Sequence, residues 1–400
     1  MWFFGKERGR SSVRDGWLRL SRPLAVVALL ANVPHAWAVD TSQPAMLEMF
    51  EASWSTLQNR MPDIFQTGYG QMWLPPPERA DSGNLSVGYD VFDRFDLGSP
   101  RNETLYGTEN GFKSLVSVGH QAGLLMYSDF VANHNGFNTQ SNSTFVAAGG
   151  YPGFVMTAQP NAPFGDFHDP SVTYQQDPVN GSLFGLIDIA QESNNQFIRQ
   201  PTTVGDPNNI PAGTVYNKPD PNNARFYPDQ ALGGTQYTDP ALGTTFTRYN
   251  FNANNPLAGD AVSENATGLL MRNMEWMIQS VGVDGFRLDA ARHFPSWVLN
   301  YFDEATFRTS TRTNLDGSIQ PIFMFSEVAD GSASTVMQYY RRDLPNRLAI
   351  SASDTTVHGN RDVLDFPLFY SMVGNLSSNG TQNNWHNIVN SSVDVADDGL

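Results

Sequence analysis

Residues 285–293 read Gly-Phe-Arg-Leu-Asp-Ala-Ala-Arg-His and hold side chains that could do chemistry. The first five residues alternate as a β-strand does, so that Phe286 and Leu288 face one side while Arg287 and Asp289 face the other. Buried charges are costly unless they are paired. Two interpretations stay open at this point. The pair is either a structural ion pair at a strand end, or a nucleophilic carboxylate kept ionised by its arginine.

Two further stretches with the composition of buried strands also finish near a carboxylate. Residues 124–131 include Asp129, and residues 322–327 end on Glu327. The carboxyl ends of the strands of a (β/α)8 barrel meet on one face, where such enzymes have their active sites. Glycoside hydrolysis needs two carboxyl groups that flank the scissile bond, one to attack or to hold a water and one to protonate the leaving oxygen. The three acidic strand ends therefore favour a hydrolytic site over a chance ion pair.

Strand-like and helix-like segments alternate along the chain, which indicates an α/β protein. Thr108 is expected to cap a helix that runs to Gly119, and further helices are expected over residues 263–280, 297–307 and 334–342. Residues 135–255 are rich in Asn, Gly, Pro and Thr. This stretch is too long to be one loop of a compact domain. We expect a small irregular inserted domain there.

Composition excludes several classes of function. The formal net charge is −16, which argues against nucleic acid and anionic membranes as partners, and the chain has no cysteine for disulfides, thiol catalysis or zinc. Residues 1–38 combine a basic segment, a short apolar run and Ala-Trp-Ala, which predicts a signal peptide and a secreted or periplasmic protein. An uncleaved anchor or a misassigned start codon is the alternative. After signal removal we expect no membrane contact.

Four stretches resemble the signature regions of the α-amylase family of glycoside hydrolases. They are residues 129–134, 186–189, 285–293 and 325–328, and residues 88–90 are also typical of that family. The resemblance spans roughly residues 45–370. It implies an α/β fold, a (β/α)8 TIM barrel that is incomplete at the C-terminus, with the small domain inserted after the third strand. The implied parts are a first barrel segment over residues 39–134, the insertion over 135–255 and the continued barrel over 256–400.

The resemblance also implies roles for individual residues. Asp289 is the nucleophile, Glu327 the acid/base and Arg287 the residue that orients Asp289, in the retaining hydrolysis of α-1,4-glucosidic bonds of a starch- or glycogen-type glucan. Asp129 is structural in this family. The implied substrate-binding residues are Tyr89, His134, Arg292 and His293, and the implied Ca²⁺ ligands are the Asn133 and Asp188 side chains and the His293 backbone carbonyl. Plain packing of Tyr89 and an ordinary polar role for Asp188 stay open.

One departure from the family pattern concerns its fourth region, a His-Asp pair expected beyond residues 365–368. The only His-Asp pair is His168-Asp169, inside the expected insertion. We therefore expect a C-terminally truncated chain that lacks the last strands and the C-terminal β-domain and that is inactive alone. A transglycosylase, an exo-acting α-glucosidase of the same family and a non-catalytic carbohydrate-binding relative remain as alternatives. We expect a monomer.

Overall fold

The computed structural model describes most of the chain after residue 44. The described residues are 45–98, 100–148, 150–158, 163–169, 183, 185–191, 234–238, 245–249, 266–309, 312–313, 317–343, 357–377 and 385–393. The expected signal peptide, residues 1–38, lies outside this description. Within the described residues no helix is long and apolar enough to cross a membrane.

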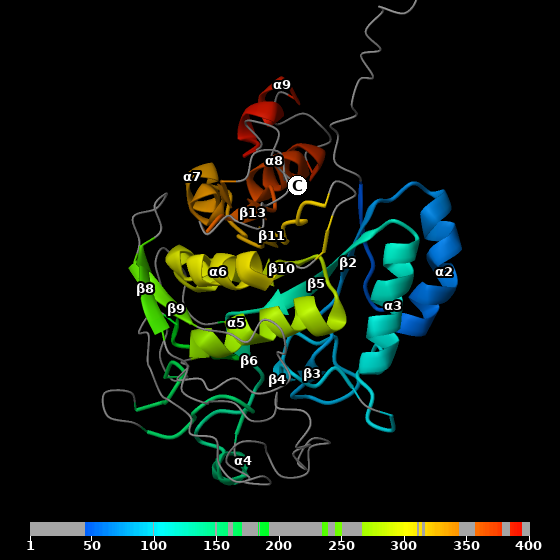
Figure 1. Ribbon diagram of the computed structural model, residues 1–400. Coiled ribbons are helices and arrows are strands. Elements are labelled where there is room, and N and C mark those ends of the chain that lie inside the picture. The colour runs from blue at the N-terminus through cyan, green and yellow to red at the C-terminus, as the bar shows by residue number, and fades with distance from the viewer. Residues whose placement is uncertain are drawn as a thin grey trace, which may run out of the picture. The chain divides into compact units, whose positions relative to one another are not determined.

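A seven-stranded sheet forms the centre of the fold (Figure 1), and its strands follow one another in the order β1-β2-β5-β10-β11-β13-β12. Six of them are parallel, and only β12 runs antiparallel, against β13. Their bounds are β1 Met46–Glu48, β2 Gln71–Leu74, β5 Leu125–Val131, β10 Gly285–Asp289, β11 Phe323–Ser326, β12 Arg341–Arg342 and β13 Asn360–Val363. Parallel strands in chain order, joined through helices, are the arrangement of a (β/α)8 barrel, so the predicted fold class is confirmed as an incomplete barrel.

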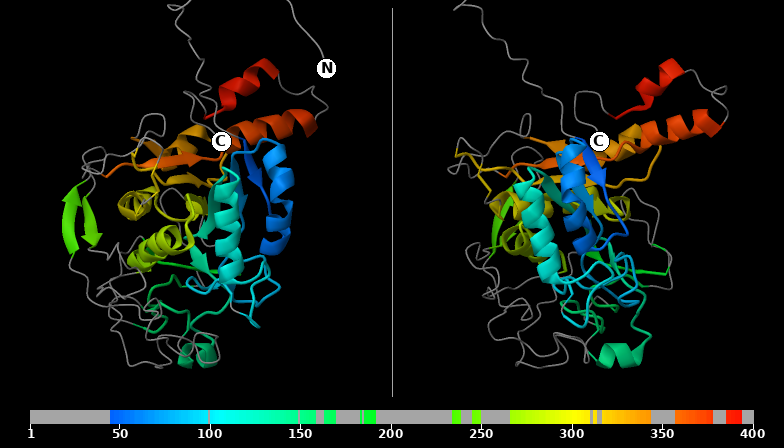
Figure 2. Two further views of the ribbon diagram at one scale, coloured as in Figure 1. Left: turned by 45° about the vertical axis from the view of Figure 1, so that its right-hand side comes forward. Right: turned by 90° about the vertical axis from the view of Figure 1, so that its right-hand side faces the viewer.

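Seven α-helices follow or connect the strands of the central sheet within the described residues. They are α2 Trp54–Gln66, α3 Glu109–Gln121, α5 Ala266–Trp276, α6 Leu299–Thr309, α7 Ala333–Val336, α8 Phe366–Ser377 and α9 Trp385–Ile388. Helix α2 packs on α3, and α5 packs on α6 (Figure 2). The predicted cap of α3 is confirmed, because Thr108 Oγ1 accepts a hydrogen bond of 3.1 Å from the Gly111 backbone N–H. The helix predicted over 263–280 begins in the description at Ala266 and becomes a π-helical turn, Met277–Val281, that ends at Gly282 with φ +93°.

The segment between β5 and α5 contributes no strand to the central sheet within the residues described. It holds helix α4 Ser143–Ala147, the pair β6 His134–Asn135 with β7 Ile187–Asp188, and the hairpin β8 Gly234–Thr238 with β9 Thr245–Tyr249. The pair β3 Arg79–Ala80 and β4 Val91–Asp93 lies beside β6. An insertion after the third sheet strand is thus present, and the domain bounds given for it above stay a prediction.

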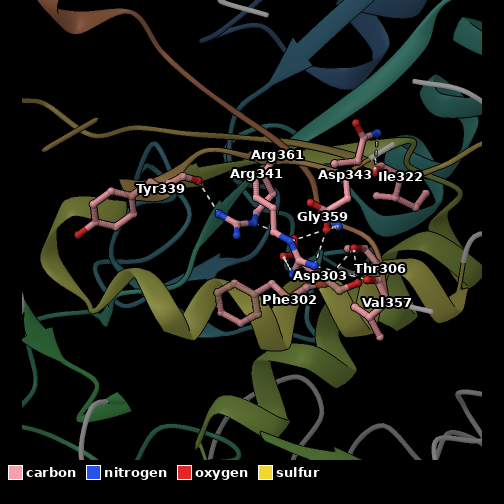
Figure 3. Close-up of polar contacts among 11 residues, drawn as sticks. Phe302, Asp303, Thr306, Ile322, Tyr339, Arg341, Asp343, Val357, Gly359 and Arg361 are labelled. Atoms are coloured by element: carbon pink, nitrogen blue, oxygen red, sulfur yellow. Dashed lines mark hydrogen bonds and ion pairs between the residues drawn. The ribbon is translucent and has the colours of Figure 1, made fainter. Parts of the chain in front are cut away.

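The helix predicted over residues 334–342 is wrong at its C-terminal end. Helix α7 and a 3₁₀ turn stop at Tyr339, and Arg341 is extended in β12. The cause is a buried cluster beneath the strand (Figure 3). Asp303 of α6 is fully buried and binds Arg341 Nη1 at 3.2 Å and Arg361 Nε at 2.7 Å. An extended backbone aligns Arg341 with Arg361 on adjacent strands, so both can neutralise the same carboxylate.

Candidate active site

Strand β10 places its two faces as the alternation predicts. Phe286 and Leu288 are completely buried, and the Phe286 ring meets Phe130 of β5 at 5.4 Å between centroids. Arg287 and Asp289 lie on the opposite face and bind each other. Because β10 is paired on both sides by parallel strands, β5 and β11, its charged face adjoins the carboxylates of those two neighbours.

The Arg287 guanidinium holds three carboxylates, one from each of three neighbouring strand ends. Its Nη1 is 2.7 Å from Asp129 Oδ1 and 2.7 Å from Asp289 Oδ1, and its Nη2 is 2.9 Å from Glu327 Oε2. The guanidinium also lies 5.2 Å from the centre of the Trp73 ring on β2. A planar fork of donors can bridge acceptors in this way, and charge-assisted bonds of this kind fix both the distance and the orientation of the acids.

Burial controls the protonation of this cluster. The pKa of Asp289 lies above its ordinary value, chiefly because the group is buried and then because Asp129 and Glu327 are close, while Arg287 opposes the shift. Burial likewise raises the pKa of Asp129. Three carboxylates around a single cation carry an excess of negative charge, so the cluster as a whole retains a proton more readily than isolated acids do. A site with one proton and one ionised carboxylate is what acid-assisted displacement requires.

Tyr89 and His134 form the wall next to this cluster. The Tyr89 hydroxyl donates to Asp129 Oδ2 at 2.7 Å, and burial raises the pKa of the phenol, so it stays a neutral donor. The His134 Nε2 lies 2.9 Å from the Tyr89 carbonyl, which can only accept, so this nitrogen carries the proton. Burial lowers the pKa of His134 to about 3, which leaves the ring neutral.

Glu327 follows β11 and is the most exposed of the three acids. Its side chain is 28% exposed, against 10% for Asp289 and 0% for Asp129. The Ala290 backbone N–H donates to Glu327 Oε2 at 3.0 Å. Ala290 adopts a left-handed conformation with φ +48°, which is strained for a residue with a Cβ. This strained turn, directly after Asp289, points the Ala290 N–H at the Glu327 carboxylate.

A cleft of about 360 Å³ opens above these groups. Six of the predicted site residues line it, namely Tyr89, His134, Asp289, Arg292, His293 and Glu327. Arg287 lies behind Asp289 and is almost entirely buried. Leu183 and Leu186 add an apolar lining that was not predicted, although Leu186 begins the signature stretch 186–189.

Comparison with known proteins identifies sequence relatives of the chain. No family model matches it. It is 29% identical to the α-amylase of Geobacillus stearothermophilus over 136 residues, which are 31% of this chain and 25% of that protein. It is 23% identical to the cytoplasmic α-amylase of Escherichia coli K12 over 264 residues, 61% of this chain and 45% of that protein. Among solved structures, an α-amylase from Malbranchea cinnamomea has a TM-score of 0.46 and 14% identity over 85% of this chain and 50% of its own.

The chain is similar to α-amylases over these stretches, which supports the predicted α-amylase family of glycoside hydrolases. It spans about a quarter to a half of the length of these two curated relatives. The chain brings its predicted nucleophile and acid/base together on one arginine at one cleft.

Arg292 binds the loop that follows β11. Its Nη1 donates to the Ala329 carbonyl at 2.6 Å, and its Nη2 is 2.7 Å from Asp330 Oδ2. The side chain therefore connects the turn after β10 to the loop after β11 while it lines the cleft. Sequence reasoning missed Asp330 because the pairing depends on how close these two loops lie.

Two of the three predicted metal ligands, Asn133 and Asp188, lie side by side. Asn133 Nδ2 donates to Asp188 Oδ1 at 3.0 Å, because His134 is in register with Asp188 across the β6–β7 pair. Asn133 Oδ1 is buried and has no hydrogen-bond partner among the described residues, so a hard oxygen donor is available beside a carboxylate. The described residues contain no group of three or more His, Asp or Glu side chains that could hold a metal. The predicted set differs, since it combines one carboxylate, one amide oxygen and one backbone carbonyl.

Proposed function

We propose that the chain carries the catalytic carboxylates of a retaining hydrolase of α-1,4-glucosidic bonds in starch- or glycogen-type glucans. One observation supports this most strongly, namely that Arg287 binds both Asp289 and Glu327, within 2.7 and 2.9 Å, at a single cleft. Retention of the anomeric configuration requires two carboxyl groups close enough for one of them to attack the sugar directly. Two acids held by one guanidinium meet that requirement better than acids placed on separate loops.

In the first step, an Asp289 carboxylate oxygen attacks the anomeric carbon while the bond from that carbon to the glycosidic oxygen breaks. The leaving oxygen takes the proton of Glu327, and a glucosyl–Asp289 ester remains. In the second step, the Glu327 carboxylate removes a proton from water, the oxygen of that water attacks the anomeric carbon, and the ester bond breaks. Both residues return to their starting states. Arg287 is paired with Asp289 throughout and favours its ionised form over the protonated one.

Tyr89 and His134 bind the sugar at the point of cleavage in this proposal. The hydroxyl of Tyr89 is fixed on Asp129, and the residue lines the cleft, so its ring can stack on the apolar face of a glucosyl unit. His134 remains neutral and so adds no positive charge next to the oxocarbenium-like transition state. Arg292 and His293 line the same cleft and are proposed to contact the substrate too.

The test uses the full-length protein and the release of reducing sugar from soluble starch. Asp289→Asn should abolish activity on every substrate. Glu327→Gln should abolish starch hydrolysis but retain glycosylation by an aryl α-maltoside with a good leaving group, because that leaving group needs no proton. Asp63→Asn on the exposed face of α2 is the matched control and should behave as wild type. Starch hydrolysis by Asp289→Asn would refute the assignment.

We also propose a structural Ca²⁺ held by Asn133 Oδ1, the Asp188 carboxylate and the His293 carbonyl. The unpaired buried oxygen of Asn133 beside Asp188 supports this ligand set. The ion would supply positive charge that ties the β6–β7 pair to the turn after β10. We further propose that residues 1–38 direct export, in which case N-terminal sequencing of the mature protein should begin at Val39.

A further inference from the structure

Arg94 is a buried cation that the proposed mechanism does not use. It follows β4 and is only 2% exposed. Its guanidinium binds three acceptors in one short segment of the chain: Nη1 donates to the Val131 carbonyl, and Nη2 donates to the His134 carbonyl at 2.8 Å and to Asn135 Oδ1 at 2.9 Å. Residues 131–135 are the link from the third sheet strand to β6, and β4 lies beside β6 (Figure 1).

This link carries two residues of the candidate site. His134 lines the cleft, and Asn133 holds the unpaired oxygen proposed for Ca²⁺. The chain leaves β5 at Val131, its last residue, and turns to pair with β7, so the Val131 carbonyl lies at the end of the central sheet and the His134 carbonyl lies beyond it. Buried carbonyls need donors, and here one side chain supplies both. The conformation of the link therefore depends on where the guanidinium is held.

Arg94 is held at both its backbone and its guanidinium. Its backbone carbonyl accepts a hydrogen bond of 2.8 Å from Asn273 Nδ2 on α5. Its guanidinium lies 5.6 Å from the centre of the Phe154 ring. Burial lowers the pKa of Arg94 to about 10, while the Glu78 and Asp93 carboxylates oppose the shift, so the group is charged near neutral pH. A charged, planar and well-anchored fork is suited to define the geometry of its acceptors.

We propose that Arg94 is a positioning residue that sets the place of His134 in the cleft and of Asn133 beside Asp188. This inference rests on the proposed function for its kinetic consequence, but its structural consequence can be measured without any activity. Arg94 acts through the link over residues 131–135 and does not reach the substrate itself. A purely structural role would lower stability without changing how this link moves or how the folded enzyme turns over.

The experiment compares Arg94→Lys with Arg341→Lys in the full-length protein. Both arginines are buried and donate hydrogen bonds to side-chain and backbone acceptors. Arg341, however, binds Asp303 in the cluster of Figure 3 and not the link over residues 131–135. Lysine keeps the charge and presents a compact ammonium that cannot reproduce the planar fork. Hydrogen–deuterium exchange by mass spectrometry follows residues 131–138, and kcat and KM on soluble starch are measured well below the melting temperature of each variant.

We expect faster exchange over residues 131–138 in Arg94→Lys alone, with exchange over β10 unchanged. We also expect a fall in kcat/KM of about 10- to 100-fold, mostly in kcat, because small displacements of positioned groups have effects of this size. Arg341→Lys should lose stability, speed exchange in α6 and β13, and keep wild-type kcat/KM.

Unchanged exchange over residues 131–138 in a folded Arg94→Lys variant would overturn the inference. A kcat equal to that of the wild type in the same variant would also overturn it. If Arg94→Lys does not fold, Asn135→Ala removes one acceptor and should speed exchange over the same residues, and no change would again overturn the inference. A wild-type protein without glucan hydrolysis would refute the proposed function instead, and the exchange comparison would still decide the role of Arg94.

Discussion

Replacing Arg287 by methionine should move the acidic limb of the kcat/KM profile to higher pH. Arg287 lies 2.7 Å from Asp289 and opposes the rise in the pKa of Asp289 that burial and the other carboxylates cause. Without the cation that pKa rises further, so the ionised nucleophile forms only at higher pH. An opposite charge at this distance is worth about 1–3 pKa units. Each unit is tenfold in the ionised fraction below the pKa, so activity on the acidic limb should fall about 10- to 1000-fold.

Arg287→Lys separates charge from geometry in the same experiment. Lysine keeps a cation near the acids but cannot bridge Asp289 and Glu327 with a rigid fork. We expect a smaller shift of the acidic limb together with a loss of kcat at all pH values. Arg312→Lys, at an ion pair with Asp284 away from the cleft, is the control. Circular dichroism should confirm folding at each pH, because unpairing buried carboxylates can cost about 3–5 kcal/mol. An acidic limb of Arg287→Met that coincides with that of the wild type would refute the reasoning.

Three further predictions concern stability and substrate contacts. Asp289→Asn should raise the melting temperature at pH 8 more than at pH 5. Burial raises the folded pKa of Asp289, so wild-type stability falls as the pH rises from the ordinary Asp pKa towards the folded pKa, and the amide removes that loss of stability. Equal changes in melting temperature at both pH values would contradict this prediction. Chelation by EDTA should lower the wild-type melting temperature, and Asp188→Asn should abolish the difference, whereas no response to chelator would contradict the Ca²⁺ proposal. Arg292→Met should raise KM for starch, because it frees the loop after β11 that Arg292 holds through Ala329 and Asp330; an unchanged KM would contradict this role.

Local patterns in the sequence were enough to predict the core of the candidate site. The alternation over residues 285–289 predicted which side chains face the sheet core, and β10 confirms it. The Thr108 cap was predictable because its hydrogen bond closes within a few residues. The signature stretches predicted Asp289 and Glu327, and the structure brings both to one cleft.

Contacts that depend on strand register and loop approach could not be predicted. Asp129 faces Arg287 because β5 and β10 pair in a register that places those two residues side by side. The Asp330 partner of Arg292 and the three acceptors of Arg94 arise in the same way, from segments far apart in sequence. Arg341 was assigned to a helix because its neighbours favour one, whereas the buried carboxylate of Asp303 draws it into an edge strand.

The most direct test of the proposed mechanism is the identification of the residue that becomes glycosylated. The full-length protein is treated with a 5-fluoro-α-glycosyl fluoride, which slows breakdown of the glycosyl ester, and is then digested and mapped by mass spectrometry. The mechanism predicts one glycosyl label per molecule, on Asp289 within the peptide that contains residues 285–289. A label on Asp129 or Glu327, or no label on a protein that hydrolyses starch, would contradict the assignment of Asp289 as the nucleophile.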